Sequence, residues 1–219
     1  MTTIFEITAS HNSGISGYSL ISYALARSTA YSLIDPDILD FYVGQVETTT
    51  PDVHWSIYRS FLKFDTSIIP SIATITRVAL RMVCRAKPLV GHEFDIQIVE
   101  QDWSASDPIA VGNMEAVYDA CLAASTSFVW ADSSVSINTQ YTGADMTIGY
   151  VNRSGNTYYS LRSSWDKDGT VPVKAQDYII IAKLDNATES YRPTLIVECT
   201  MPPTITGISS VTGLSSIQF

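Results

Sequence analysis

Two pairs of aspartates, Asp35 with Asp37 and Asp166 with Asp168, are the first candidates for chemistry in this chain. Cleavage of a glycosidic bond requires two carboxyl groups at a defined separation, one on each side of the bond that breaks. Both pairs, however, lie in turn-forming sequences, where aspartate is favoured because its side chain hydrogen-bonds to the local backbone. A turn role therefore explains both pairs without catalysis.

The three histidines, His11, His54 and His92, lie in or beside loop-like segments. His92-Glu93 is not followed by the second histidine of a zinc-protease motif. The sequence also has no Gly-x-Ser-x-Gly nucleophile turn and no glycine-rich phosphate-binding loop. We interpret all three histidines as surface residues, and we expect no catalytic residues and no enzymatic activity.

The segment Asp166-Lys167-Asp168-Gly169 resembles part of a calcium-binding loop, because oxygen-bearing side chains alternate and a glycine permits a sharp bend. The remaining acidic ligands of an EF-hand do not follow it. A polar turn explains the same residues with fewer requirements. We therefore expect no cofactor, and the alternative is a calcium ion held by Asp166 and Asp168.

Aromatic side chains are numerous, with 12 Tyr and 4 Trp, and sugar recognition uses aromatic faces beside a few hydrogen-bonding groups. Alternation also places Tyr159, Leu161 and Trp165 on one face of an extended segment, as expected of a packed sheet. We favour core or interface packing over a sugar platform. If a glycan does bind here, the residues expected to contact it are Tyr158, Arg162, Trp165 and Asp166.

The elements that must position these side chains are β-strands. In residues 55–84, apolar side chains recur with a period of two: Leu62 and Phe64 share one face, and Leu80 and Met82 share another. Pro70, which cannot donate a ladder hydrogen bond, marks the corner between the two runs. The pattern predicts two half-buried strands of a β-sandwich.

Further strands are expected at residues 41–43, 94–99, 178–184 and 194–199, where apolar and β-branched residues alternate or cluster. Residues 113–124 differ, because their apolar side chains recur every three or four positions and Asn113 is placed as an N-cap. We predict one short helical insert there. The apolar residues that share its face are Met114, Val117, Tyr118 and Cys121.

A family resemblance covers residues 40–200. The runs RSFLKFD at 59–65 and ALRM at 79–82, together with YVG at 42–44 and YRPTLIV at 191–197, resemble the core and closing strands of DNRLRE-type domains. These domains are jelly-roll modules of the carbohydrate-binding-module group, so the resemblance implies an all-β, jelly-roll-like antiparallel sandwich and glycan binding. The chain departs from the family after Trp103, so no loop function is transferred to that segment.

The expected organisation is an N-terminal arm at 1–34, a sandwich domain at 35–200, and a Pro-Pro linker with a C-terminal arm at 201–219. The periodicity of the N-terminal arm fits either a short helix or two strands. The C-terminal arm is apolar and uncharged, and we expect it either to add a strand to another subunit or to remain a frayed terminus. Its expected interface residues are Ile205, Ile208, Val211, Leu214, Ile217 and Phe219.

Charge and cysteine content restrict the partners and the compartment. Thirteen Lys and Arg against 22 Asp and Glu give a net charge of −9, and the basic residues are scattered, so nucleic acid is not an expected partner. We read neither a signal peptide nor a membrane-spanning segment. Cys84, Cys121 and Cys199 have no metal-site spacing, and we expect buried free thiols.

Three functions from different classes follow from these observations. The first is a structural protein of a phage or virus particle, made in the host cytoplasm, that decorates or cements the head or belongs to the tail. Its expected partners are other virion proteins and further copies of itself. The second is a carbohydrate-binding or adhesin module, as the resemblance implies. The third is a glycan-active enzyme, which the absence of a convincing acid–base pair disfavours. We favour the first.

Overall fold

Antiparallel β-strands make up most of this protein in its computed structural model, which describes residues 2–34, 40–49, 51–87, 93–172 and 176–203. The strands are β1 (Thr2–Thr8), β2 (His11–Ser19), β3 (Ala30–Ile34), β4 (Phe41–Thr48), β5 (His54–Asp65), β6 (Thr74–Ala86), β7 (Asp95–Glu100), β8 (Ser127–Asp132), β9 (Gln140–Thr142), β10 (Asn156–Ser163), β11 (Gln176–Ile181) and β12 (Thr194–Thr200). The helices are α1 (Tyr23–Arg27), α2 (Met114–Ala123) and α3 (Ser164–Asp168). The all-β class is confirmed, with three short helices where one was expected.

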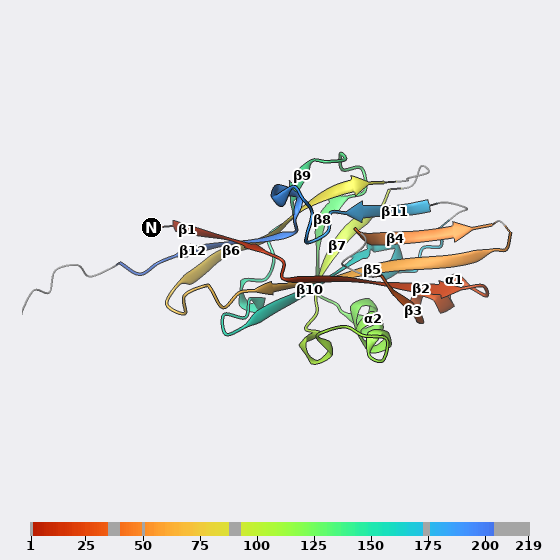
Figure 1. The fold of residues 1–219 in the computed structure, drawn as a ribbon, viewed down its shortest axis with the longest axis horizontal. Coiled ribbons are helices and arrows are strands. Elements are labelled where there is room, and N and C mark those ends of the chain that lie inside the picture. The colour runs from red at the N-terminus through yellow and green to blue at the C-terminus, as the bar shows by residue number, and fades with distance from the viewer. Residues whose placement is uncertain (1, 35–39, 50, 88–92, 173–175, 204–219) are drawn as a thin grey trace, which may run out of the picture.

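Two layers of strands form the body (Figure 1). One layer has the order β1-β12-β6-β9, and the other has the order β11-β4-β5-β10-β7-β8, with β2 and then β3 added beside β5. β6 belongs to both layers, because its first part pairs with β12 and its last residues pair with β11. The sandwich is therefore continuous through one 13-residue strand.

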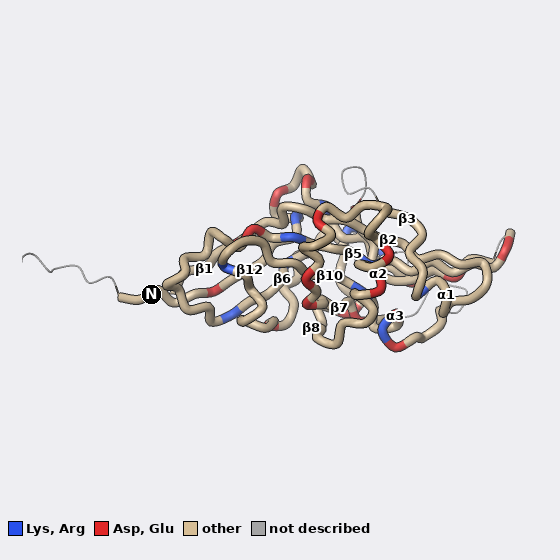
Figure 2. The backbone as a smooth tube through the Cα atoms, turned by 90° about the horizontal axis from the view of Figure 1, so that it is seen from below, with Lys and Arg blue, Asp and Glu red and all other residues tan. Residues whose placement is uncertain are grey.

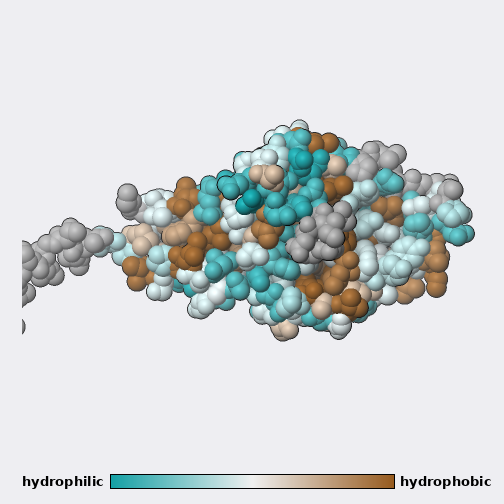
Figure 3. Space-filling view, viewed as in Figure 1, coloured by the Kyte–Doolittle hydropathy of each residue, from teal (hydrophilic) through white to brown (hydrophobic). Residues whose placement is uncertain are grey.

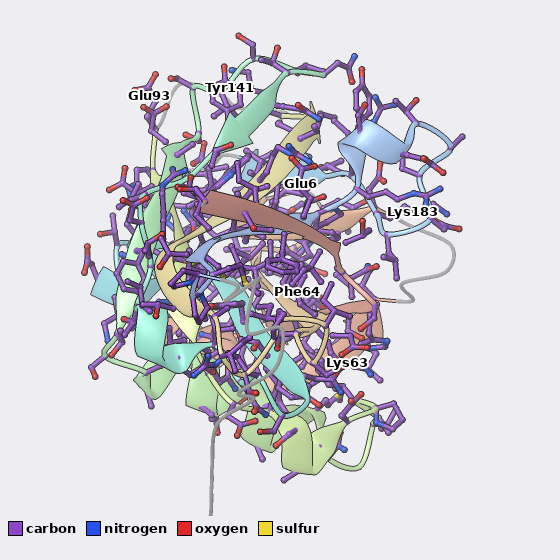
Figure 4. All side chains as sticks on the ribbon, turned by 90° about the vertical axis from the view of Figure 1, so that its left-hand side faces the viewer. Glu6, Lys63, Phe64, Glu93, Tyr141 and Lys183 are labelled. Carbon is purple, nitrogen blue, oxygen red and sulfur yellow. The ribbon has the colours of Figure 1, made fainter. Side chains whose placement is uncertain are left out.

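β5 organises the larger layer. Its first half pairs with β4 and its second half with β10, while β2 pairs along nine of its residues. Because successive side chains point to opposite faces, Phe64 enters the space between the layers and Phe61 points to the outer face. Figure 4 shows Phe64 inside the body and Lys63 nearer its rim.

The main hydrophobic core lies between the two layers, where Leu62, Leu80, Met82 and Val197 are fully buried. Burying one such side chain contributes roughly 1.5–3 kcal/mol to folding. The period of two in residues 55–84 therefore reports the inward face correctly, and β5 and β6 occupy these residues as expected.

A second core lies on the outer face of the larger layer, beneath α2. The expected helical face is confirmed, because Met114, Val117, Tyr118 and Cys121 are all buried there. Asn113 precedes the helix, but its side chain accepts a hydrogen bond from the Ala110 N–H at 2.7 Å instead of capping the first turn. The helix thus covers a face of the sheet that would otherwise meet solvent.

Residues 2–34 are part of the sandwich, so the expected N-terminal arm is wrong. β1 pairs with β12 over seven residues, and β2 lies between β3 and β5. Both readings of the periodicity hold in part, because two strands, the helix α1 and a further strand follow one another. The expected interface residues of the C-terminal arm, from Ile205 to Phe219, lie outside the described residues.

Cys84, Cys121 and Cys199 are buried and form no disulfide, as expected. Figure 2 shows basic and acidic residues spread along the backbone of the described chain. Within that part of the chain, no helix has the length and apolarity needed to cross a membrane.

Candidate functional site

Asp166, the residue shared by the glycan and calcium hypotheses, is fully buried in the first turn of α3. Its backbone N–H donates to Ser163 Oγ at 3.0 Å, which caps the helix. Its carboxylate accepts two hydrogen bonds from Arg59, from Nε at 2.7 Å and from Nη2 at 2.9 Å. Arg27 Nε lies 3.5 Å from the same carboxylate. Asp166 thus accepts a buried, bidentate ion pair from Arg59.

Arg59 uses its remaining donors on the backbone of two helical segments. Its Nη1 donates to the Tyr118 carbonyl at 2.7 Å, and its Nη2 donates to the Arg27 carbonyl at 2.9 Å. Its guanidinium also lies 3.6 Å from the centre of the Tyr118 ring. Burial lowers the pKa of Arg59, but Asp166, Tyr118 and Cys121 together more than offset this, and the net pKa is raised. Arg59 therefore stays charged while it holds α1, α2 and α3 on the sheet.

Gly17, on β2, permits the close approach of α1 and α2 to this strand. A Cβ at this position would lie 2.0 Å from the Ala26 carbonyl oxygen and 2.2 Å from the Tyr118 hydroxyl. The same hydroxyl donates to the Ala26 carbonyl at 2.9 Å. Any larger residue at Gly17 must therefore displace Ala26 of α1 and Tyr118 of α2 from β2.

Arg162 holds the C-terminal end of α2. It donates to the carbonyls of Leu122 at 3.0 Å and Ala124 at 3.1 Å, and also to that of Cys121. Carbonyls at a helix C-terminus lack intrahelical partners, so a buried guanidinium satisfies them. Burial is the main cause of a lowered pKa for Arg162.

The residues expected to bind a glycan are not an exposed platform. Arg162 and Asp166 are fully buried, and their polar atoms are bonded within the protein. Trp165 is half-buried and packs against Phe94 and the main core. Tyr158 is the remaining member, and it faces a different part of the structure. The expected grouping of the four is therefore corrected.

The calcium hypothesis meets the same difficulty. Residues 164–168 form α3, with Gly169 in the left-handed conformation at φ 76° as its C-cap, so this segment is a helix end and not an open loop. Asp168 is exposed, whereas Asp166 is buried against Arg59. The described residues contain no group of three or more His, Cys, Asp or Glu that could hold a metal ion.

Tyr158 lines a pocket of about 180 Å³ at the other end of β10. The walls come from three separate segments: the chain after β7, the loop after residues 148–150, and the start of β10. The lining residues are Asp102, Ser104, Tyr150, Asn152, Asn156, Thr157 and Tyr158. Pockets for small molecules typically measure about 300–1,000 Å³, so this one is small.

Internal hydrogen bonds hold the walls of the pocket in place. Thr157 Oγ1 accepts from the Asn152 N–H at 2.9 Å and lies 2.7 Å from Thr66 Oγ1. The Tyr158 hydroxyl donates to Asp107 Oδ2 at 3.2 Å, and Lys63 Nζ donates to the same oxygen at 2.9 Å. Burial, followed by the effect of Asp107, raises the pKa of Tyr158. The site combines carboxylate, amide and hydroxyl groups with aromatic rings, which are groups that bind a polyhydroxylated ligand.

Sequence reasoning missed most of this pocket. Asp102, Tyr150 and Asn156 are distant in the sequence, so no spacing connects them. The available signal was the segment after Trp103, where the chain departs from the family pattern. Trp103 packs edge-on against Tyr158, with ring centres 4.7 Å apart, and so brings that segment to the start of β10.

Exposed apolar side chains lie at both ends of the elongated body and also on the surface between them (Figure 3). At the β1 end, Ile4 is 57% exposed and Ile72 is 66% exposed. At the α1 end, Leu20, Ile21 and Leu25 are exposed, with Ile21 at 79%. Contiguous exposed apolar surface marks contact regions more often than isolated apolar residues do.

Comparisons with known proteins complete the description of the site. No family model and no curated protein sequence matches this chain. The resemblance to DNRLRE-type domains therefore stays a prediction, and the function must be argued from the geometry.

Proposed function

We propose that this chain is a non-enzymatic structural protein of a phage or virus particle, either a head decoration or cement protein or a tail component. In this role the β-sandwich is a rigid unit that binds neighbouring subunits. The observation that carries the proposal is that β1 and α1 lie at opposite ends of an elongated body (Figure 1), with the exposed Ile4 on β1 and the exposed Leu20 and Ile21 just before α1.

The internal construction supports this role. A protein that transmits contacts from one end to the other must resist deformation between them. The Arg59–Asp166 pair fixes three helical segments to the sheet, and β6 joins the two layers covalently. Apolar surface at each end then offers two contact regions whose relative position is set by the fold.

Mass spectrometry of purified particles tests the proposal. The chain is expected in particles banded by density gradient, at a constant ratio to the major capsid or tail protein across preparations. Immunogold labelling in negative stain then assigns it to the head or the tail. Recovery of the chain only from the soluble host fraction, with none in intact particles, would falsify the proposal.

Carbohydrate binding is the second candidate, and the pocket beside Tyr158 favours it. Its polar walls and two tyrosine rings suit one sugar ring, and it lies at the start of β10, whereas the buried ion pair lies beyond the end of this strand. A glycan array with the full chain, followed by calorimetry on the hits, is the measurement. Asp102→Ala should abolish binding, whereas Asp168→Ala, an exposed carboxylate at the far end of β10, should leave it unchanged. No hit on the array, or equal loss in both variants, would remove this candidate.

A further inference from the structure

β1 forms an open edge of the sandwich. It pairs with β12 on one side, and no other described strand pairs with it. Sheet edges in soluble proteins are usually protected by proline, lysine, a bulge or a covering segment. β1 reads TTIFEIT and pairs with β12 in an unbroken register, so it has no proline, lysine or bulge. Its one charged residue, Glu6, is held by Arg81 at 2.7 Å and 3.2 Å.

Other edges of the described sheet are better protected. β8 is covered by the segment that contains β9: the Ala144 N–H donates to the Val129 carbonyl at 3.3 Å, and Trp130 Nε1 donates to the Tyr141 carbonyl at 3.0 Å. β3 has only five residues, and its Ala30 N–H donates to the Glu115 side chain at 2.8 Å. β1 is therefore the edge most suited to accept another strand.

We propose that β1 pairs with β1 of a second copy of this chain, antiparallel and about a two-fold axis at Phe5. This register uses all seven residues of the strand and places Phe5 opposite the second copy's Phe5, and Ile4 opposite the second copy's Glu6. Phe5 is half-buried at the open end of the main core, so the pairing covers the rest of its ring.

Charge and exposure favour this register over its neighbours. Centring the axis on Glu6 would place two carboxylates directly opposite each other, which is destabilising. Centring it on Ile4 would leave Ile7 and Thr8 unpaired. The register at Phe5 avoids both costs, and it gives the exposed Ile4 a neighbour in the second copy. The two bodies then extend in opposite directions from one continuous sheet (Figure 4 views this end of one copy).

This inference deepens the proposed function, because it names a second copy of the chain as the partner at the β1 end. The two can fail separately. A chain found in particles but monomeric in solution would overturn the pairing and leave the structural role standing.

A pair of substitutions at one residue tests the register. Sedimentation velocity on the full chain, over a hundredfold range of concentration, is expected to show a monomer–dimer equilibrium. Ile4→Glu places a carboxylate opposite the second copy's Glu6, and it should weaken the dimer at least tenfold. Ile4→Lys places an ammonium there, and it should retain the dimer. Val111→Glu, at an exposed apolar residue before α2 and outside both end regions, is the matched control and should behave as the unmodified chain.

Several outcomes overturn the pairing: a monomer at every concentration, equal effects of Ile4→Glu and Ile4→Lys, or a loss of the dimer in Val111→Glu as large as that in Ile4→Glu. Cross-linking gives an independent measurement. Phe5→Cys should form a disulfide-linked dimer under oxidation, because directly opposite side chains are about 4.5–5.5 Å apart at Cβ. The native thiols are buried, so they do not compete. Failure of Phe5→Cys to cross-link in a chain that still dimerises would also reject the register.

Discussion

The two ends of β10 both carry polar residues, but these residues have different roles. At its end, Arg162 and the adjoining Asp166 are fully buried and bonded to α2 and Arg59. At its start, Asn156 and Tyr158 line a small pocket that opens to solvent. Charged groups therefore serve cohesion at one end, and amide and hydroxyl groups are available to a ligand at the other. What distinguishes the two ends is burial: Arg162 and Asp166 are closed off from solvent, whereas the pocket includes the exposed Asn152 and the half-buried Asn156.

The largest expected effect comes from breaking the ion pair at the buried end. Asp166→Ala leaves the Arg59 guanidinium buried and uncompensated, which typically costs about 3–5 kcal/mol of unfolding free energy. Guanidinium chloride denaturation is the measurement. Asp168→Ala removes an exposed carboxylate two residues away, and it should change stability by less than about 0.5 kcal/mol. Similar losses of unfolding free energy in the two variants would contradict the prediction that the buried carboxylate contributes more than the exposed one.

Arg162→Met should cost about 2–3 kcal/mol, because three carbonyls at the end of α2 lose a charged donor. Arg153→Met is the matched control. Arg153 also donates to two backbone carbonyls, those of Ser71 at 2.9 Å and Ala73 at 2.7 Å, but its side chain is exposed. Its loss should cost less than about 1 kcal/mol. Hydrogen exchange should rise at residues 121–124 in the first variant alone.

Burial raises the pKa of Cys121 to about 11 from an ordinary value of 9.0. Above pH 9 the unfolded chain loses this proton more readily than the folded chain, so stability should fall as pH rises toward 11. The expected loss is on the order of 1–2 kcal/mol by about pH 10, and Cys121→Ala should give a shallower slope.

Alkylation is a second test of the burial of Cys121. Iodoacetamide labelling of Cys121 at pH 8, followed by peptide mass spectrometry, should proceed no faster than global unfolding. Rapid labelling of the native protein would mean that the region beneath α2 is more open than its hydrogen bonds indicate.

The smallest effects are expected from the removal of two tyrosine hydroxyls. One belongs to Tyr118, which packs against Arg59, and the other belongs to Tyr150, which lines the pocket. Tyr118→Phe removes the hydrogen bond to Ala26 and should cost about 1 kcal/mol. The Tyr150 hydroxyl, beside the pocket, is buried and has no hydrogen-bond partner among the described residues. Tyr150→Phe should therefore be neutral or stabilising by up to about 1 kcal/mol, because a desolvated group is removed. Thermal unfolding of both variants is the measurement. A loss of stability in Tyr150→Phe as large as that in Tyr118→Phe would indicate that the Tyr150 hydroxyl has a partner such as bound water.

The inward face of the sandwich could be predicted from the sequence, because alternation in residues 55–84 reports directly on burial. The helix at 114–123 could also be predicted, since its apolar face has a helical period. The outer face of β5 could not. Arg59 alternates with the inward residues, yet α2 covers it, and a period of two carries no information about what covers the second face.

The pairing of the N-terminal strands with the sandwich, and the pocket, were missed for a related reason. β1 and β2 find their partners about 190 and 45 residues later in the chain, and no local pattern encodes such pairings. The Asp166–Gly169 segment was read as a turn because Asp and Gly favour turns, but the cap from Ser163 makes it a helical turn. Both errors concern tertiary context, which overrides local preference.

The passage of β6 from one layer to the other has a mechanical consequence. Tension applied at the β1 end enters β12 and β6 along the strand direction, so their ladder bonds are loaded in shear and share the force. The backbone of β6 then carries the force into the second layer, where its last residues pass it to β11 through ladder pairing. One strand shared by both layers lets the sandwich respond to stretching as one unit.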